Sequence, residues 1–246
     1  MFISIADILS RRFPDKHFPR FFVRYIEHII HQDEMNAILA CTGNLEGVDF
    51  IHAVLDELGV RVRVEHKERI PQTKSPLVFV SNHPLGGVDG MVLLWILNEN
   101  RGGRVKAIVN DFLMNVTPLK ELFVPVNKVG GQCREYAQKQ RELWESDCDV
   151  LTFPAGACSR RQEGGVIADL PWRDTFIRRA KEYGRDVVPI WFEGQNSRFF
   201  YNLAYWRKKF GIRMNIEMLF LVDEMFKARG KEFVVHIGHR IPYGNL

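Results

Sequence analysis

The segment Ser81-Asn82-His83-Pro84-Leu85-Gly86-Gly87-Val88-Asp89-Gly90 links two apolar stretches of the chain. Residues 77–80 (Leu-Val-Phe-Val) precede it, and residues 91–97 (Met-Val-Leu-Leu-Trp-Ile-Leu) follow it. A short apolar run that ends in a glycine-rich turn is typical of a buried strand, and a longer apolar run is typical of a helix. Ligands bind at the carboxyl ends of strands in α/β sheets, so we expect this turn to hold the functional site.

Further strands and helices are expected to alternate along the chain after this first pair. Apolar or extended runs predict strands at 105–109, 123–128, 150–152, 187–192 and 233–237, and helices are expected at 130–146 and 172–183. Such alternation is typical of a largely parallel sheet that is covered on both faces. The sequence therefore predicts an α/β fold with a mostly parallel central sheet flanked by helices.

The N-terminal part of the chain has a different pattern. Apolar residues recur at helical spacing before Gly59, which is typical of a helix end. From residue 60 the period changes, because valines alternate with charged residues up to Glu65 as in a half-exposed strand. We expect one domain over residues 1–246, with a helical portion at 1–59 and an α/β core at 60–246.

The composition excludes several classes of protein. The chain has 34 basic and 30 acidic residues, a net charge of +4 that permits attraction to an anionic membrane but does not indicate nucleic-acid binding. Four scattered cysteines argue against a zinc site and a disulfide scaffold, and they favour the cytoplasm. The sequence shows no signal peptide, membrane-spanning run, P-loop, dinucleotide fingerprint or Gly-x-Ser-x-Gly elbow. No metal or cofactor is therefore expected.

His83 and Asp89 are the first candidates for chemistry, since the glycines between them allow a tight turn. An imidazole whose one nitrogen is held by a carboxylate has the other nitrogen free to act as a base. A base in this position accelerates attack on a carbonyl by roughly 10²–10⁴-fold. A second interpretation remains open, in which His83 caps backbone groups and Asp89 caps the following helix.

The turn resembles the first motif of the glycerolipid acyltransferases of the lysophosphatidic acid acyltransferase type, whose histidine and aspartate form a catalytic dyad. Residues 123–128, 153–160 and 188–190 resemble the second, third and fourth motifs of this family, in the family's order. The similarity spans about residues 77–192 and is closest to the hemolysin-like branch, which includes bacterial enzymes that acylate amino-acid lipids. It implies that His83 is a general base and that Asp89 orients it.

The sequence departs from the family pattern at several positions. Five residues rather than four separate the histidine from the aspartate, and we expect a bulge at Gly86-Gly87 to absorb the extra one. Ala155 and Cys158 replace the usual glutamate and arginine of the third motif. The second and third motifs hold the acceptor in this family, so the acceptor remains open. The resemblance implies a set of substrate-binding residues, namely Asn127, Lys128, Gly156, Ser159 and Arg160.

The resemblance implies an acyltransferase. It would move a fatty acyl group from acyl carrier protein or coenzyme A to a hydroxyl or amine of a lipid precursor, such as a lyso-amino-acid lipid or a lysophospholipid. Backbone N–H groups around Gly156 are candidates for stabilising the oxyanion. Two alternatives stay open: a non-catalytic peripheral lipid-binding protein on the same fold, and a thioesterase that depends on Cys158 as nucleophile.

The segment 197–210 mixes aromatic with basic residues, as amphipathic helices at membrane interfaces do. This pattern favours a peripheral location on the anionic inner face of the membrane. The other interpretation is a helix that buries an apolar stripe in the protein and leaves only its basic end in water. That stripe has helical spacing and consists of Phe199, Leu203, Trp206 and Phe210.

Overall fold

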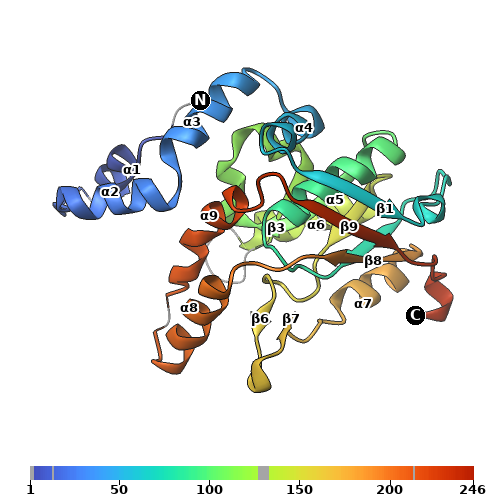
Figure 1. Ribbon diagram of the computed structural model, residues 1–246. Coiled ribbons are helices and arrows are strands. Elements are labelled where there is room, and N and C mark those ends of the chain that lie inside the picture. The colour runs from blue at the N-terminus through green and yellow to red at the C-terminus, as the bar shows by residue number, and fades with distance from the viewer. Residues whose placement is uncertain (1–2, 13, 127–132, 213) are drawn as a thin grey trace.

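The computed structural model describes residues 3–12, 14–126, 133–212 and 214–246, and these form a seven-stranded sheet with helices on both faces (Figure 1). The strand order is β1-β9-β8-β2-β5-β3-β4. The strands are β1 (Arg61–Glu65), β2 (Val78–Ser81), β3 (Val105–Asn110), β4 (Phe123–Val126), β5 (Asp149–Thr152), β8 (Val187–Glu193) and β9 (Glu232–Ile237). All neighbouring strands run parallel except β8 and β9, so the prediction of a mostly parallel sheet is confirmed.

Strand β2 lies in the middle of this sheet, between β5 and β8, and all four of its residues are buried. Its side chains point alternately to the two faces. Phe79 belongs to the core formed with α4 (Gly47–Glu57) and α5 (Val88–Asn100). Val78 and Val80 pack with α6 (Cys133–Glu145) and α7 (Thr175–Glu182) on the other face. Burial on both faces explains why β2 is continuously apolar in sequence.

The N-terminal portion is helical, as predicted, and consists of α1 (Ile5–Arg12), α2 (Arg20–Ile29), α3 (Gln32–Thr42) and α4. His31 joins α2 to α3 and binds α9 (Leu221–Phe226). Its Nε2 lies 3.0 Å from Oδ1 of Asp223, and its ring stacks on Phe226 with centroids 4.4 Å apart. Asp223 and Phe226, which lie far along the chain, therefore anchor the N-terminal helices through His31.

Two features of segment 160–183 differ from the sequence-based prediction. Helix α7 begins at Thr175 rather than at Trp172, because the Arg173 N–H donates to the Pro154 carbonyl at 3.2 Å and is therefore not available to a helix. A two-stranded hairpin of β6 (Arg160–Arg161) and β7 (Ile167–Ala168) precedes it. Strands of two residues carry no periodicity, so the sequence did not predict this hairpin.

Helix α8 (Arg198–Lys209) does not bury the predicted stripe, and that interpretation of segment 197–210 is wrong. Phe199, Trp206 and Phe210 are 51%, 46% and 73% exposed. The helix carries a second apolar stripe beside the first, and this one is buried: Phe200, Tyr201 and Ala204. Phe200 packs against Cys158 and lies under the Arg160 guanidinium, so contact with the segment after β5 selects the buried face.

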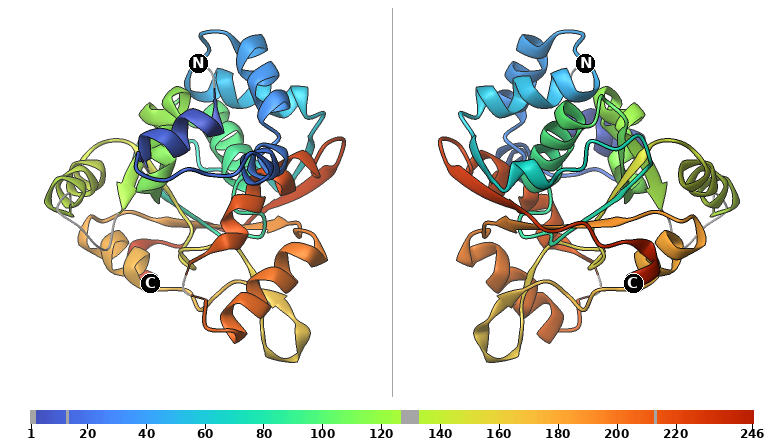
Figure 2. Two further views of the ribbon diagram at one scale, coloured as in Figure 1. Left: turned by 90° about the vertical axis from the view of Figure 1, so that its left-hand side faces the viewer. Right: turned by 90° about the vertical axis from the view of Figure 1, so that its right-hand side faces the viewer.

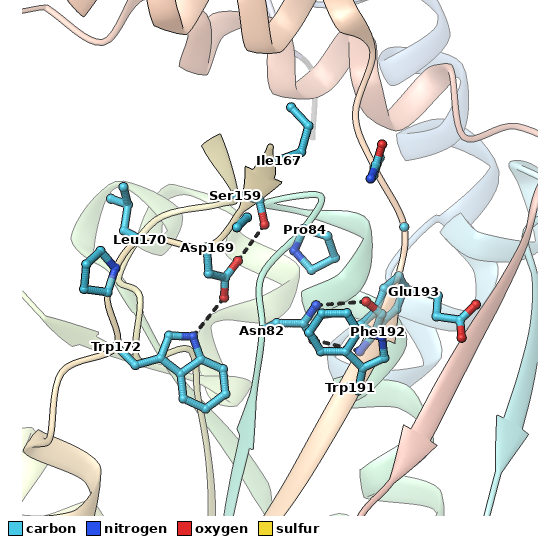
Figure 3. Close-up of a pocket in the computed structure, with 14 residues that line it drawn as sticks. Asn82, Pro84, Ser159, Ile167, Asp169, Leu170, Trp172, Trp191, Phe192 and Glu193 are labelled. Carbon is cyan, nitrogen blue, oxygen red and sulfur yellow. Dashed lines mark hydrogen bonds between the residues drawn. The ribbon is translucent and has the colours of Figure 1, made fainter. Parts of the chain in front are cut away.

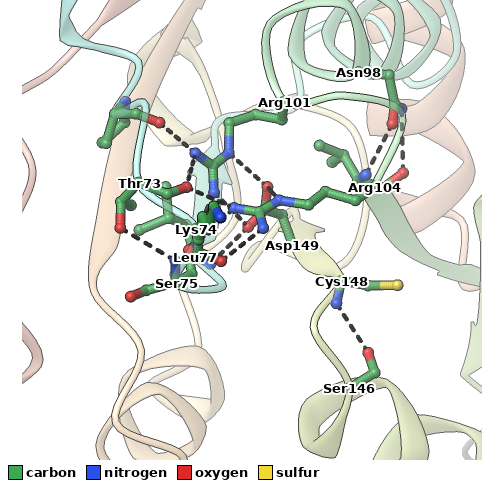
Figure 4. Close-up of polar contacts among 12 residues, drawn as sticks. Thr73, Lys74, Ser75, Leu77, Asn98, Arg101, Arg104, Ser146, Cys148 and Asp149 are labelled. Atoms are coloured by element: carbon green, nitrogen blue, oxygen red, sulfur yellow. Dashed lines mark hydrogen bonds and ion pairs between the residues drawn. The ribbon is translucent and has the colours of Figure 1, made fainter.

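The amino ends of the central strands are held together by Asp149, which is fully buried at the start of β5 (Figure 4). Its carboxylate accepts the Leu77 N–H at 2.8 Å and pairs with the Nε atoms of Arg101 and Arg104 at 2.7 and 3.2 Å. Both arginines also donate to carbonyl groups of the loop that leads into β2, including that of Thr73. One carboxylate thus joins β2, β5 and the end of α5.

We expect Asp149→Ala to lower the free energy of unfolding by about 3–5 kcal/mol, because it leaves a buried guanidinium without its counterion. Chemical denaturation monitored by circular dichroism measures this change. Asp174→Ala is the matched control, since Asp174 pairs with Arg178 on the exposed surface and should contribute less than about 1 kcal/mol. Equal losses in the two variants would contradict the role given to Asp149.

Candidate active site

The structure brings His83 and Asp89 together, as the sequence predicts. His83 follows β2, Asp89 lies in the first turn of α5, and Nδ1 of the ring is 3.0 Å from Oδ2 of the carboxylate. Gly86 absorbs the extra residue between them, with a φ of +79° that favours glycine. The insertion relative to the family pattern therefore leaves the histidine–aspartate pair intact.

Asp89 is fully buried, and its carboxylate is well provided with hydrogen bonds. Oδ2 also accepts the N–H groups of Leu85 and Gly86 at 2.9 and 3.3 Å, and Oδ1 accepts the Gly90 N–H at 2.9 Å. Burial alone would raise the pKa of Asp89. Electrostatic attraction to the His83 ring, and hydrogen bonds from that ring, Leu85 and Gly86, outweigh burial, so the pKa of Asp89 lies below its ordinary value.

The second interpretation is wrong, because Gly87 is the N-cap residue of α5 and no side chain caps this helix. The Asp89 carboxylate instead accepts N–H groups of the turn before the helix and binds the imidazole. An ionised carboxylate only accepts hydrogen bonds, so we assign the ring proton to Nδ1 of His83. Nε2 then carries a lone pair and can accept a proton. The ring stacks on Phe153 with centroids 4.1 Å apart, and the His83 side chain is 18% exposed. The imidazole ring is therefore held in place, and part of the His83 side chain is open to solvent.

Strand β8 and the loop after it hold the turn from one side. The Asn82 side chain accepts the Phe192 N–H at 2.7 Å and donates to the Phe192 carbonyl at 2.9 Å, which extends the pairing of β2 with β8 by one residue. Farther along, Nδ2 of Asn196 donates to the Leu85 carbonyl at 3.1 Å. These bonds determine where His83 leaves the sheet.

The segment after β5 holds the turn from the other side. A Cβ atom at Gly86 would lie 2.9 Å from Cβ of Cys158 and 3.2 Å from Cδ2 of Leu221, which is closer than side chains pack. Ser159 donates its N–H to the His83 carbonyl at 2.8 Å. The segments that resemble the first and third motifs are therefore in direct contact.

The predicted substrate-binding residues have different surroundings. Asn127 and Lys128 lie outside the described residues. The Ser159 hydroxyl donates to Oδ1 of Asp169 at 2.6 Å. Arg160 pairs with the fully buried Glu217 at 3.2 Å and donates to the Cys158 carbonyl, so its guanidinium is held inside the protein.

Gly156 is exposed and has a φ of +68°. Its N–H donates to the Phe153 carbonyl at 2.9 Å and is therefore used within the turn. The next N–H, that of Ala157, donates to no acceptor in the described part of the chain. Within the described residues Ala157 therefore has a free N–H donor of the kind that an oxyanion site needs, whereas Gly156 does not.

The surroundings of Cys158 do not suit a nucleophile. The side chain is 2% exposed, and its Sγ lies 2.7 Å from Nη1 of Arg160. Burial, the largest effect, raises the pKa of the Cys158 thiol, although the positive Arg160 opposes it. A buried thiol with a raised pKa forms little of the reactive thiolate.

A cavity of about 710 Å³ lies beside the turn, against the residues that flank His83 in sequence (Figure 3). Its wall includes Asn82, Pro84, Asp169, Trp172 and Trp191. Most of these groups are apolar, and the volume lies within the roughly 300–1,000 Å³ usual for small-molecule sites. The sequence did not predict Asp169 or Trp172, because they lie in an irregular segment without periodicity.

Two kinds of feature are absent from the described ranges, a metal-binding cluster and a membrane-spanning helix. These residues contain no cluster of three or more His, Cys, Asp or Glu side chains able to hold a metal ion. None of the helices described is both long enough and apolar enough to cross a bilayer.

Matches of three kinds relate this chain to known proteins. The sequence matches the family profile "Acyltransferase" over residues 8–246. A "Lyso-glycine lipid O-acyltransferase" from Phocaeicola vulgatus is 48% identical to this chain over 228 residues. The alignment covers 93% of this chain and 81% of the relative. A protein of the same name from Bacteroides thetaiotaomicron is 46% identical over 243 residues. That alignment covers 98% of this chain and 89% of the relative. The solved 1-acyl-sn-glycerophosphate (LPA) acyltransferase PlsC from Thermotoga maritima has a TM-score of 0.48 at 16% identity, covering 98% of this chain and 78% of that one.

Gly86→Ala tests the geometry of the turn. Positive φ costs a residue with a Cβ atom about 1–2 kcal/mol, and the contact with Cys158 adds about 1–3 kcal/mol of overpacking. We expect the free energy of unfolding to fall by at least about 2 kcal/mol in urea denaturation. Gly90→Ala is the control, because a Cβ atom there meets open space within a helix and should be neutral or stabilising. A Gly86→Ala variant as stable as Gly90→Ala would contradict this geometry.

Proposed function

Because the chain belongs to the acyltransferase family, and is thus an enzyme of acyl transfer, we propose that it acylates a lysolipid with His83 as general base and Asp89 as the group that orients it. The observation that carries this proposal is the 3.0 Å hydrogen bond between the His83 ring and the buried Asp89 carboxylate. A base needs this arrangement, because its second nitrogen must be free and correctly directed.

The reaction proceeds by direct transfer from an acyl thioester, carried by acyl carrier protein or coenzyme A. Nε2 of His83 takes the proton of the acceptor hydroxyl as the oxygen attacks the thioester carbonyl carbon. The tetrahedral intermediate then collapses, the carbon–sulfur bond breaks, and His83 returns the proton to the departing thiolate. Asp89 stabilises the imidazolium that exists between these steps, as the aspartate of a catalytic triad does.

The Ala157 N–H is the donor we assign to the developing oxyanion. It lies in the turn after β5, whose Phe153 contacts the His83 ring, and it has no acceptor within the described ranges. A backbone donor held in place before the reaction stabilises transition-state charge without reorganising.

The acceptor we propose is a lysolipid with a glycine headgroup. Two relatives above 45% identity are named lyso-glycine lipid O-acyltransferases. The sequence supports the same choice, because Ala155 and Cys158 replace residues that the glycerolipid acyltransferases use to hold glycerol phosphate. Arg160 cannot replace that lost phosphate contact while it is paired with Glu217.

We expect His83→Ala and Asp89→Asn to reduce acyl transfer by about 10²–10⁴-fold, since each removes the base or its orientation. The assay uses purified protein, an acyl thioester and lyso-glycine lipid, with the diacylated product measured by mass spectrometry. His52→Ala is the control, because His52 is exposed on α4 and should not affect the rate. Wild-type rates in His83→Ala would exclude this mechanism, and lipid binding without any turnover by the native protein would favour a non-catalytic binding protein.

The thioesterase alternative is tested separately with Cys158→Ala. Direct transfer needs no thiol, so this variant should form product within a few-fold of the native rate. Complete loss of transfer in a folded Cys158→Ala protein, together with an acyl group bound covalently to the native thiol, would instead support Cys158 as nucleophile.

We propose that the enzyme docks on an anionic membrane through the exposed stripe of α8 and the aromatic residues of α2. Both helices lie at the left-hand side of Figure 1, which faces the viewer in the left panel of Figure 2. On α2, Phe21 and Tyr25 are 76% and 56% exposed. Lys208 and Lys209 are exposed at the end of α8, so basic and apolar groups occur together. Interfacial helices combine these two kinds of group.

Lys208→Gln/Lys209→Gln should weaken binding to anionic vesicles by about 30-fold, because each lysine near the surface contributes about 1 kcal/mol. Vesicle sedimentation measures this effect. Arg207 is left unchanged, since it pairs with the buried Glu217 at 2.7 Å and supports the fold. Lys74→Gln/Lys181→Gln removes the same charge away from α8 and should have little effect. Equal weakening by both pairs would exclude docking through α8.

A further inference from the structure

The carboxylate of Asp169 is the convergence point of three donors around the candidate active site. Its Oδ2 accepts the His83 N–H at 3.1 Å and the Trp172 Nε1–H at 3.1 Å. Its Oδ1 accepts the Ser159 hydroxyl at 2.6 Å and also lies 3.3 Å from the His83 nitrogen. Figure 3 shows the side chains of Ser159 and Trp172 directed to this carboxylate from either side.

The bond to His83 involves its backbone, not its ring. The peptide group before His83 is held through its N–H by Asp169, and the one after it is held through its C=O by the Ser159 N–H at 2.8 Å. These two peptide groups determine the direction of the Cα–Cβ bond, and therefore where the imidazole ring points. Asp89 can fix the rotation of the ring only if the His83 backbone already directs the side chain toward the Asp89 carboxylate.

Asp169 is suited to this task because a carboxylate accepts several hydrogen bonds at once and donates none. Within the described ranges it forms no ion pair with Lys, Arg or His. Structural carboxylates elsewhere in the chain, such as Asp149 and Glu217, are each paired with two arginines. The negative charge of Asp169 is therefore offset by hydrogen bonds from the His83 backbone N–H, the Ser159 hydroxyl and the Trp172 indole.

We propose that Asp169 is a positioning residue for acyl transfer, which holds the His83 backbone from the wall of the adjacent cavity and so aims the imidazole ring. This inference rests on the proposed role of His83 as the base. Misplacing a catalytic group by about 1 Å costs roughly 10²-fold in rate, so a residue that never touches the substrate can affect turnover strongly.

The central experiment compares Asp169→Ala with Asp169→Asn in the full chain. We expect Asp169→Ala to lower kcat by about 10–100-fold with KM changed by less than about twofold. The His83 ring would lose its orientation, whereas substrate binding would be retained. Asp169→Asn keeps one acceptor oxygen for the His83 N–H and should restore most of the rate. Asp174→Asn is the matched control, since Asp174 is exposed in the same region and touches none of these groups; it should leave kcat unchanged.

A spectroscopic measurement separates positioning from a loss of folded protein. In the native protein, nuclear magnetic resonance should show a downfield Nδ1–H proton of His83 bound to Asp89. In Asp169→Ala this signal should shift or broaden, while urea denaturation shows that the protein is still folded under assay conditions. An unchanged His83 signal in Asp169→Ala, or an unchanged kcat, would overturn the proposal.

The two proposals fail in distinguishable ways. If His83→Ala retains full activity, the proposed function is wrong, whatever Asp169→Ala does to the rate. If His83→Ala is inactive but Asp169→Ala has the native kcat and the native His83 signal, only the inference about Asp169 is wrong.

Discussion

Complete burial of β2 between β5 and β8 is the constraint on which the rest of the structure depends. A strand with neighbours on both edges and helices on both faces can shift its register only by breaking every contact at once. Buried polar groups hold its two ends: Asp149 with its arginines before the strand, and the Asn82 side chain after it. His83 therefore leaves the sheet at one defined point.

A buried carboxylate is costly unless it is hydrogen-bonded or paired with a positive charge. Asp89 meets this condition with three backbone N–H groups and the His83 ring. The interactions that make its burial tolerable are the same ones that lower its pKa and keep it ionised. Stabilisation of the turn and orientation of the imidazole are thus two effects of one arrangement.

The residues around the turn fall into two groups. Those of the first group orient His83, and those of the second hold the surrounding segments together. Arg160 belongs to the second group, because Glu217 and the aromatic ring of Phe200 hold its guanidinium. The family resemblance implied that Arg160 contacts the substrate, and in the structure its charge is paired with the buried Glu217. The same packing covers Phe200 and leaves the neighbouring stripe of α8 in solvent, where it forms the proposed membrane contact.

The sequence by itself determined the elements whose signals are local. The apolar run of β2, the glycine-rich turn and the apolar start of α5 are consecutive, so the pairing of His83 with Asp89 needed only six residues of chain to form. Tertiary structure alone decided the features that depend on distant partners: the antiparallel β9, the buried face of α8, the ion pair of Arg160 and the three donors that meet at Asp169. The physical reason is that periodicity records which residues are apolar, whereas packing decides which apolar face is covered. Hydrogen bonds between residues as far apart as His83 and Asp169 leave no pattern in sequence.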